Sequence, residues 1–539
     1  MTNEASATGA QQIASGYAFD GPALELGTVM VDGVCDPTAQ VRIPLATVNR
    51  HGLVAGATGT GKTKSLQVIA EQLSAAGVPC LMADIKGDLS GLSRPGEAGE
   101  KIQQRATDTG DEWTPTAYPV EFLSLGTPRA GSEPSGIGVP VRATISSFGP
   151  VLLSKVLGLN QTQESTLGLI FHWADQKGLP LLDLKDLRAV IQFLTSDDGK
   201  PELKALGAVS KTTAGVILRA LVNLEADGGD TFFGEPELEP KDLMRLDAQG
   251  RGIITLLEVG EQAARPVMFS TFLMWVLADL FTTLPEVGDI DKPKLVFFFD
   301  EAHLLFTDAS KAFLAQVEQT VKLIRSKGVG VFFCTQLPTD VPNAVLSQLG
   351  ARVQHALRAF TPDDQKALSK TVRTYPKTEV YDLEMALTSL GIGEAIVTVL
   401  SERGAPTPVA WTRMRAPRSL MDTIGPEAIG AAAQASALQA EYGQTIDRES
   451  AYEKLSARLE PPPPLAPPAA DPQLPPPLPV DVGGATASGE VKSRGTAEPG
   501  MLEKVMNSPA FKSAMRSAGT VIGREITRSI FGTGRRRRR

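Results

Sequence analysis

Eight residues, GATGTGKT at positions 56–63, constrain the fold of this 539-residue chain more than any other feature. They follow the apolar run LVA and precede SLQVIAEQL, whose apolar residues recur at helical spacing. Glycines let backbone N–H groups curl around a phosphate at a helix N-terminus, where the helix dipole favours anions. The order of strand, glycine-rich loop and helix therefore predicts a P-loop within a βαβ unit of an α/β domain.

The P-loop pattern also predicts what its residues bind. Lys62 is expected to reach the β- and γ-phosphates of ATP, and the Thr63 hydroxyl is expected to bind Mg²⁺. The predicted cofactors are therefore ATP and Mg²⁺. The predicted nucleotide-binding residues are Gly56, Ala57, Thr58, Gly59, Thr60, Gly61, Lys62 and Thr63.

A second signal is KLVFFFDEAH at 294–303, an apolar strand that ends in two acids. Ligands of α/β proteins gather at the carboxyl ends of parallel strands. We therefore expect Asp300 to hold Mg²⁺ through water and Glu301 to orient the water that attacks the γ-phosphate. A solvated acidic turn is the alternative interpretation of this strand end.

A third apolar strand, at 330–334, ends in Thr335 and Gln336. A polar side chain beside the strand of the acids can sense the γ-phosphate, although a plain strand end has the same pattern. The predicted catalytic residues are Lys62, Glu301 and Gln336, and the predicted metal ligands are Thr63 and Asp300.

Other polar residues leave their roles open. Asp84 and Lys86 are expected to support the magnesium site or to form a plain turn. His303 is expected to hydrogen-bond Glu301. The arginines that could complete the site of a neighbouring subunit are Arg50, Arg325, Arg352 and Arg358.

Cysteine and hydropathy patterns exclude several classes of protein. The three cysteines and four histidines show no ligand spacing, which argues against a disulfide framework or a zinc site. The longest mostly apolar stretch, 267–278, is shorter than the roughly 20 residues that span a bilayer. We expect a cytoplasmic protein without a transmembrane segment.

The composition divides the chain into seven predicted segments. They are a flexible N-terminus at 1–20, the first part of the ATPase core at 21–142, a helical insertion at 143–249, the second part of the core at 250–426, a helix at 427–459, a Pro-rich disordered linker at 460–500 and a basic amphipathic tail with a short helix at 501–539. Edge strands are predicted within 21–50, and buried strands at 252–259, 294–299, 330–334, 352–359, 394–400 and 409–413.

The motifs together resemble the HerA/FtsK branch of P-loop ATPases, and within it the bacterial HerA-like group. NRHGLVAGATGTGKT, ADIKGDLSGL, FFFDEAHLLF and TQLPTDVPNAVLSQLG carry the resemblance, which covers about 20–415 and the RSIFGTG-polyarginine end. DEAH also occurs in superfamily-2 helicases, but here Asp300 follows Lys62 by 238 residues, much further than in that family.

The resemblance implies a RecA-like core with a mostly parallel sheet and an inserted helical subdomain. It also implies a homo-oligomeric, hexameric ring with the active site between subunits, DNA as the translocated partner, and a nuclease or other protein partner. Conjugation and secretion ATPases of the same branch suggest protein remodelling or a regulatory role as the alternative function.

The charge of −8 is the sum of two unlike parts. The tail 501–539 has ten Lys/Arg and two Asp/Glu, a charge of +8, which leaves 43 against 59, or −16, for residues 1–500. An acidic body argues against a basic coat for nucleic acid. The tail could bind nucleic acid, an acidic partner or, peripherally, an anionic membrane.

Overall fold

The computed structural model describes residues 2–84, 87–126, 137–205, 210–226, 228–258, 266–288, 290–307 and 309–459. The strands are β1 (Ala23–Val31), β2 (Val34–Pro44), β3 (Gly52–Ala55), β4 (Cys80–Asp84), β5 (Val120–Leu125), β6 (Val139–Val141), β7 (Ile254–Glu258), β8 (Leu295–Phe299), β9 (Val329–Thr335), β10 (Ala351–Gln354), β11 (Glu394–Thr398) and β12 (Ala410–Met414). The helices of the first half are α1 (Thr2–Ser15), α2 (Lys62–Ala75), α3 (Glu100–Thr109), α4 (Ile145–Val156), α5 (Gln161–Gln176), α6 (Leu184–Thr195), α7 (Lys200–Ala205) and α8 (Lys211–Ala226). Those of the second half are α9 (Pro266–Thr283), α10 (His303–Phe306), α11 (Lys311–Ile324), α12 (Asn343–Leu346), α13 (Pro362–Val372), α14 (Leu383–Ser389), α15 (Pro426–Ala435), α16 (Leu438–Tyr442) and α17 (Ala451–Leu459).

All these strands join one sheet in the order β2-β1-β12-β11-β10-β3-β9-β8-β4-β7-β5-β6. The run from β10 to β6 is parallel, whereas β11, β12, β1 and β2 extend it in antiparallel fashion. The predicted α/β class with a mostly parallel sheet is confirmed. β2 forms one edge, whereas β1, which was also predicted as an edge strand, lies inside the sheet between β2 and β12.

The central parallel strands are apolar throughout because both faces of the sheet are covered. Every residue of β8 and β9 is buried, as expected for parallel strands between helical layers. Phenylalanine rings of the two strands pack in pairs, Phe298 with Phe332 and Phe299 with Phe333, each with centroids 5.4 Å apart. This packing fixes the ends of β8 and β9 relative to each other.

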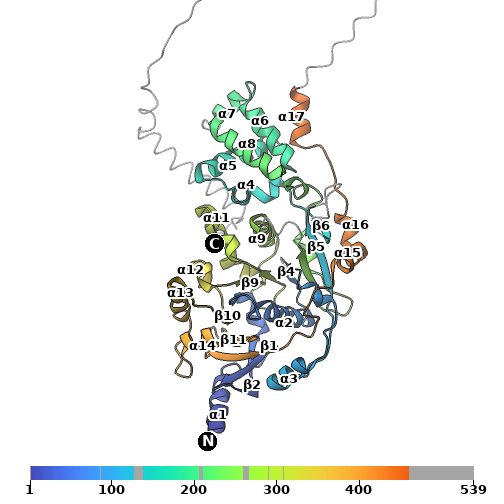
Figure 1. Ribbon diagram of the computed structural model, residues 1–539. Coiled ribbons are helices and arrows are strands. Elements are labelled where there is room, and N and C mark those ends of the chain that lie inside the picture. Colours follow the sequence, from blue (N-terminus) through green and yellow to red (C-terminus); the bar gives the residue numbers. More distant parts are fainter. Residues whose placement is uncertain are drawn as a thin grey trace, which may run out of the picture. The chain divides into compact units, whose positions relative to one another are not determined.

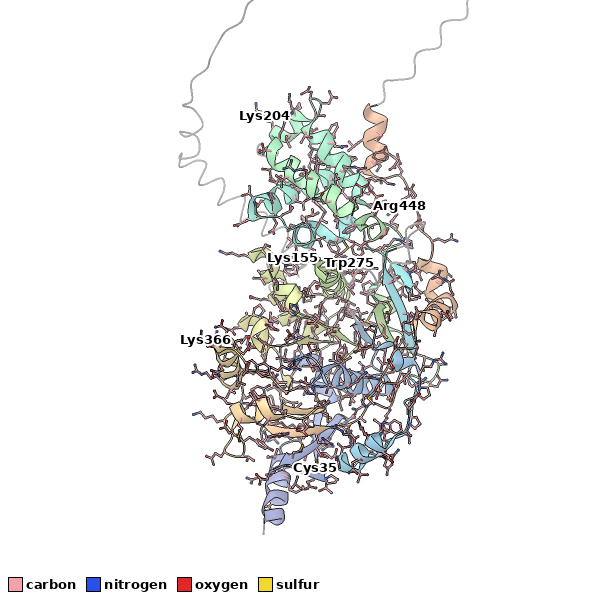
Figure 2. The ribbon with its side chains drawn as sticks, viewed as in Figure 1. Cys35, Lys155, Lys204, Trp275, Lys366 and Arg448 are labelled. Atoms are coloured by element: carbon pink, nitrogen blue, oxygen red, sulfur yellow. The ribbon has the colours of Figure 1, made fainter. Side chains whose placement is uncertain are left out.

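Helices α4 to α8 gather beyond one end of the core, where Figure 1 shows them as the teal and green group. Helix α9 is apolar on all sides because α4, α10 and α11 pack against it. Its Trp275 is buried near the junction of this helical subdomain with the core, close to Lys155 of α4 in the view of Figure 2. The helices from α4 to α8 lie within 143–249, the range predicted as a helical insertion.

The N-terminal segment differs from the prediction. Residues 1–20 were expected to be a flexible lead, but α1 forms there and packs on β1 and β2. Ala10, Ile13 and Tyr17 are buried at a spacing of three and four residues, and the Tyr17 hydroxyl donates to the carbonyls of Val397 and Pro408 at 3.0 and 2.6 Å. These long-range contacts stabilise a helix that its small polar residues do not predict.

The segment 427–459 also differs, because α15, α16 and α17 replace the single predicted helix. The Arg142 guanidinium donates to the Tyr442 carbonyl at 3.0 Å, and the Tyr442 hydroxyl donates to Asp242 at 2.5 Å. These contacts hold Tyr442 at the end of α16, so the helix ends there. A separate helix, α17, follows and packs on α6. The predicted linker 460–500 and tail 501–539 lie outside the described residues. Within the described ranges, no helix is long and apolar enough to span a bilayer.

Candidate nucleotide site

The P-loop connects β3 to α2 at the carboxyl edge of the sheet. Gly61 precedes the first turn of α2 with φ of 112°, a conformation that glycine adopts without steric cost. Gly56 has φ of 150°, and a Cβ atom there would lie 2.5 Å from the Cβ of His355. The loop thus lies tightly against His355. The first N–H groups of α2 have no acceptor within the helix. This arrangement is suited to binding a phosphate.

The support beneath the loop is His355, which the sequence did not single out. Its Nδ1 lies 2.8 Å from the Glu394 carbonyl and its Nε2 lies 2.9 Å from Ser65 Oγ, inside α2. Burial lowers the pKa of His355 to about 4, so the ring is neutral and can donate to the carbonyl while it accepts from Ser65. Because the chain turns here to support the P-loop, β10 ends at Gln354, earlier than the predicted 352–359.

Lys62 points back into the loop. Its Nζ donates to the carbonyls of Gly56 at 2.5 Å and Ala57 at 3.2 Å. The ammonium charge is therefore held inside the curve of backbone that the glycines create. Ala57 N donates to the Ala356 carbonyl at 2.8 Å, which ties the loop to the segment after β10.

The acid pair follows β8 at the same edge of the sheet. Glu301 has a left-handed backbone with φ of 47°, rare for a non-glycine residue, and its N–H donates to Asp300 Oδ1 at 2.9 Å. Glu301 Oε2 lies 3.4 Å from Nδ1 of His303, and the hydrogen-bonding role of His303 stays a prediction. The turn after the strand thus orients both carboxylates.

Gln336 lies between the P-loop and the acids, because β9 lies between β3 and β8. In register, Ala55 pairs with Thr335, and Phe299 pairs with Phe333. Gly56 N donates to the Thr335 carbonyl at 3.2 Å and Ala302 N donates to the Cys334 carbonyl at 2.8 Å. Gln336 is exposed and lines a depression of about 410 Å³ with His303, Phe306, Thr307, Leu337 and Asp340. The structure therefore brings all three predicted motifs together.

A second carboxylate pair lies beside the first and includes Glu258, which the sequence did not indicate. Asp84 of β4 and Glu258 of β7 are register partners, only 2% and 8% exposed. Asp84 accepts from the backbone N–H groups of Asp88 and Leu89 at 3.2 and 2.9 Å, whereas Glu258 Oε1 has no hydrogen-bond partner among the residues that the structure describes. Burial raises the pKa of Asp84 to about 6, and burial together with the Asp84 charge raises that of Glu258 to about 8.

The candidate arginines lie in different places. Arg358 Nη2 donates to the Thr58 carbonyl of the P-loop at 3.3 Å. Arg50 precedes β3 and Arg325 precedes β9, so both lie at the opposite edge of the parallel strands. Arg352 is held within its own subunit by the carbonyls of Thr374 and Leu346, at 2.8 and 3.4 Å. Lys86 lies outside the described residues.

The residues present fit a magnesium–nucleotide complex. Thr63 and Asp300 offer the oxygen donors that Mg²⁺ prefers. Among the described residues no group of three or more His, Cys, Asp or Glu side chains could hold a metal ion. A cation at Thr63 and Asp300 would therefore take further ligands from phosphate oxygens and water.

Residues 31–539 match the family described as Helicase HerA-like C-terminal. The chain belongs to this family. The resemblance of its motifs to the HerA branch is thereby confirmed. No curated protein matches the chain.

Several solved structures are similar to this HerA-like chain. The unbound monoclinic form of the bacterial conjugative coupling protein TrwBdeltaN70 has 16% identity and a TM-score of 0.48, with 76% of this chain and 94% of that chain covered. The plasmid coupling protein TrwB in complex with ADP and Mg²⁺ gives the same four values. VirB4 of Thermoanaerobacter pseudethanolicus has 14% identity and a TM-score of 0.46, with coverage of 74% and 98%.

Proposed function

We propose that this HerA-like chain is a Mg²⁺-dependent ATPase. One observation carries the proposal: the P-loop, Gln336 and the acid pair follow three adjacent parallel strands, β3, β9 and β8, at one edge of the sheet. Phosphoryl transfer needs mainly positioning and electrostatic stabilisation, and this edge combines N–H donors, an ammonium group and carboxylates.

Each residue of this site has a separate role in the proposed hydrolysis of ATP. Backbone N–H groups of the P-loop bind the phosphates, and Lys62 leaves the carbonyls of Gly56 and Ala57 to contact the β- and γ-phosphates. Thr63 and Asp300 hold Mg²⁺, which neutralises charge on the phosphate oxygens when bound. Glu301 accepts a proton from the attacking water and Gln336 orients that water.

Two substitutions test the ATPase. Lys62→Ala should abolish nucleotide binding or turnover. Glu301→Gln should retain ATP binding and lower turnover by about 100-fold or more, since general-base catalysis contributes that much. Glu379→Gln, at an exposed site, is the matched control. Undiminished turnover in Glu301→Gln would refute the catalytic assignment.

We further propose that the ATPase is a ring-forming motor that acts on DNA, a function shared by analogy with its family. Exposed Lys204, Lys211 and Arg219 could bind phosphates locally. They lie on α7 and α8 of the helical subdomain, where Figure 2 labels Lys204. The measurement is the ATPase rate at low salt with duplex DNA, single strands and RNA, on a sample whose assembly mass is known. No stimulation by any DNA would refute a DNA motor.

Protein remodelling is the alternative, and the charge of −16 on residues 1–500 favours it. A protein cargo would stimulate ATP hydrolysis where nucleic acid does not. Deleting residues 500–539 tests the basic tail as a separate element. Loss of DNA binding in that variant would assign the tail to nucleic acid, and loss of liposome flotation would assign it to anionic membrane.

A further inference from the structure

Gln336 is an exposed residue in a stretch of chain that is otherwise buried or half-buried. Thr335 before it and Pro338 after it are buried, and Leu337 is half-buried. The proposed role of Gln336 is to orient the attacking water. A glutamine loses much rotamer freedom when its amide is fixed, so a backbone that is already held in place lowers the entropic cost of orienting that water.

The strand before Gln336 is bonded to both motifs of the candidate site. The Thr335 carbonyl accepts from Gly56 N of the P-loop at 3.2 Å, and the Cys334 carbonyl accepts from Ala302 N, just after the acid pair, at 2.8 Å. The residue that precedes Gln336 therefore has a fixed position relative to both motifs.

The chain after Gln336 turns at once. Residues Pro338–Asp340 form one 3₁₀ turn, and Asp340 N donates to the Leu337 carbonyl at 3.1 Å. The ring of Pro338 restricts its φ, which favours such a turn. Leu337 packs against the apolar cluster that includes residues of α13 and α14. The residue that follows Gln336 is thus also anchored.

A single carboxylate oxygen joins the two neighbours of Gln336. Asp340 Oδ2 accepts from Thr335 Oγ1 at 2.7 Å and from Leu337 N at 3.0 Å. Hydrogen bonds to a carboxylate are stronger than those between neutral groups. The reach of Asp340 back to an N–H three residues earlier is the arrangement that caps the start of a helical turn. Asp340 therefore closes the backbone around Gln336.

Asp340 also lines the depression of about 410 Å³ that contains Gln336 and His303. It could therefore act on the attacking water directly or through Gln336. Because Oδ2 already accepts from two donors on either side of Gln336, the geometry favours a role through Gln336.

We infer that Asp340 is a positioning residue that fixes the backbone of Gln336 and so aims its amide at the attacking water. This role rests on the proposed ATPase and on the proposed role of Gln336 within it. Misplacement of a group by about 1 Å can cost about 100-fold in rate. Loss of the Asp340 carboxylate should therefore lower turnover and leave ATP binding intact, since the P-loop binds the phosphates.

The experiment measures kcat, KM and ATP affinity with Mg²⁺ on the full chain. We expect Asp340→Ala to lower kcat about tenfold, as a displaced Gln336 would. Asp340→Asn should stay within about threefold of wild type, because an amide oxygen can accept the same two hydrogen bonds. ATP affinity should stay within about twofold in both variants, since neither changes the P-loop.

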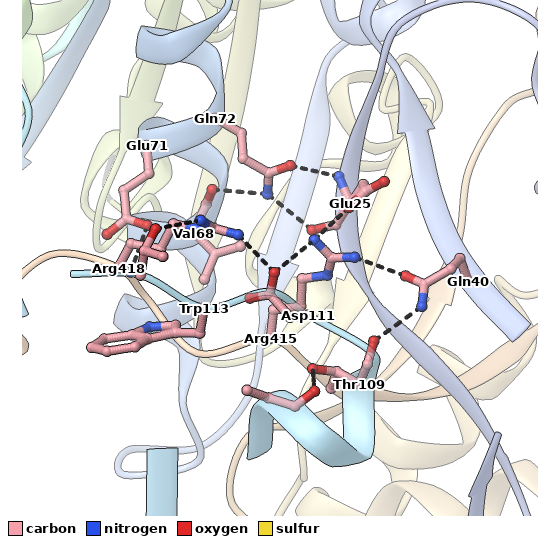
Figure 3. A network of polar contacts seen from close by, with 12 residues as sticks. Glu25, Gln40, Val68, Glu71, Gln72, Thr109, Asp111, Trp113, Arg415 and Arg418 are labelled. Atoms are coloured by element: carbon pink, nitrogen blue, oxygen red, sulfur yellow. Dashed lines mark hydrogen bonds and ion pairs between the residues drawn. The ribbon is translucent and has the colours of Figure 1, made fainter. Parts of the chain in front are cut away.

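Two controls separate turnover from stability. Asp382→Ala is the matched control, because Asp382 Oδ1 also accepts from two backbone N–H groups, at the start of α14, at 3.0 and 3.2 Å. Asp111→Ala removes a carboxylate that accepts from Arg415 and Arg418, at 3.3 and 2.7 Å, in the network of Figure 3. Both controls should lower the melting temperature and leave the kcat of the folded protein unchanged.

The Gln336→Ala background shows whether Asp340 acts through Gln336. There Asp340→Ala should change kcat by less than about twofold, since residues that act as a unit are not additive. Thr335→Val keeps the side-chain shape and removes one of the two donors, so kcat should fall about threefold, less than in Asp340→Ala. This milder variant provides the test if the melting curve shows that Asp340→Ala is unfolded.

Three results would overturn the role of Asp340. They are wild-type kcat in Asp340→Ala or in Thr335→Val, an equal fall of kcat with and without Gln336, and a kcat of Asp340→Asn as low as that of Asp340→Ala. The last result would mean that the charge of Asp340 acts on the water directly. A wild-type chain that does not hydrolyse ATP would instead refute the proposed ATPase. If Glu301→Gln lowers turnover and Gln336→Ala does not, the ATPase stands and the role of Asp340 is refuted.

Discussion

Glu258→Gln should stabilise the protein at neutral and alkaline pH. Glu258 is a buried carboxyl beside Asp84, and its pKa rises from the ordinary 4.5 to about 8 in the folded state. The folded chain therefore keeps a proton between pH 4.5 and 8 that the unfolded chain has released. The contribution of the protonated Glu258 carboxyl to the free energy of unfolding is complete below pH 4.5 and is lost as pH rises to 8. At ~1.36 kcal/mol per pKa unit, the loss is about 3 kcal/mol at pH 7 and about 5 kcal/mol above pH 8.

A glutamine at this position has nearly the shape of the protonated Glu258 side chain and cannot ionise, so the variant removes this loss. The assay is urea unfolding of both proteins at pH 6.0, 7.0 and 8.5, with Glu97→Gln, an exposed carboxylate, as the matched control. The stability of Glu258→Gln relative to wild type should increase by several kcal/mol across this range. A difference that does not change with pH would show that Glu258 is ionised and compensated throughout, and would refute the reasoning.

Three further predictions concern the support of the site. Burial lowers the pKa of His355 to about 4, so the stability that its neutral ring contributes in full above pH 6.5 should be lost as pH falls towards 4; thermal melts of Glu258→Gln, in which Glu258 does not titrate, would measure this loss, and a melting temperature that stays constant over this range would contradict it. Gly393 precedes β11, and its N–H donates to the Thr60 carbonyl of the P-loop at 3.0 Å. Gly393→Ala should lower the melting temperature and weaken ATP binding, because φ is 71° and a Cβ would lie 3.0 Å from Arg105 Nη1; equal melting temperatures would contradict this. Lys155→Met should lower kcat without weakening ATP binding, since Lys155 of α4 donates to the Thr307 carbonyl just beyond the acid pair; an unchanged kcat would contradict it.

Several elements could be predicted because their signals are local. The P-loop is a strand, a glycine-rich turn and a helix within about 25 residues, and each part has its own pattern. β8 and β9 were predicted from uninterrupted apolar runs, which buried parallel strands require. The acid pair comes directly after β8 and Gln336 comes directly after β9, so predicting the strands also predicted that these residues lie at strand ends.

Other features depend on contacts between distant residues. His355 supports the P-loop only because β10 lies beside β3, almost 300 residues away in sequence. α1 is stable because Ala10, Ile13 and Tyr17 reach the core, although its own residues are small and polar. Hydrophobic periodicity predicts neither which strands are neighbours in the sheet nor which distant residues contact a helix.

The sequence by itself determined that this chain has a phosphate-binding loop, a strand that ends in two acids and a HerA-like set of motifs. Local spacing is sufficient for these features because each depends on a few consecutive residues. Only the tertiary structure decided that Glu258 lies beside Asp84 and that His355 is buried beneath the P-loop. The order of strands in the sheet sets these neighbours, and that order results from the packing of the whole chain.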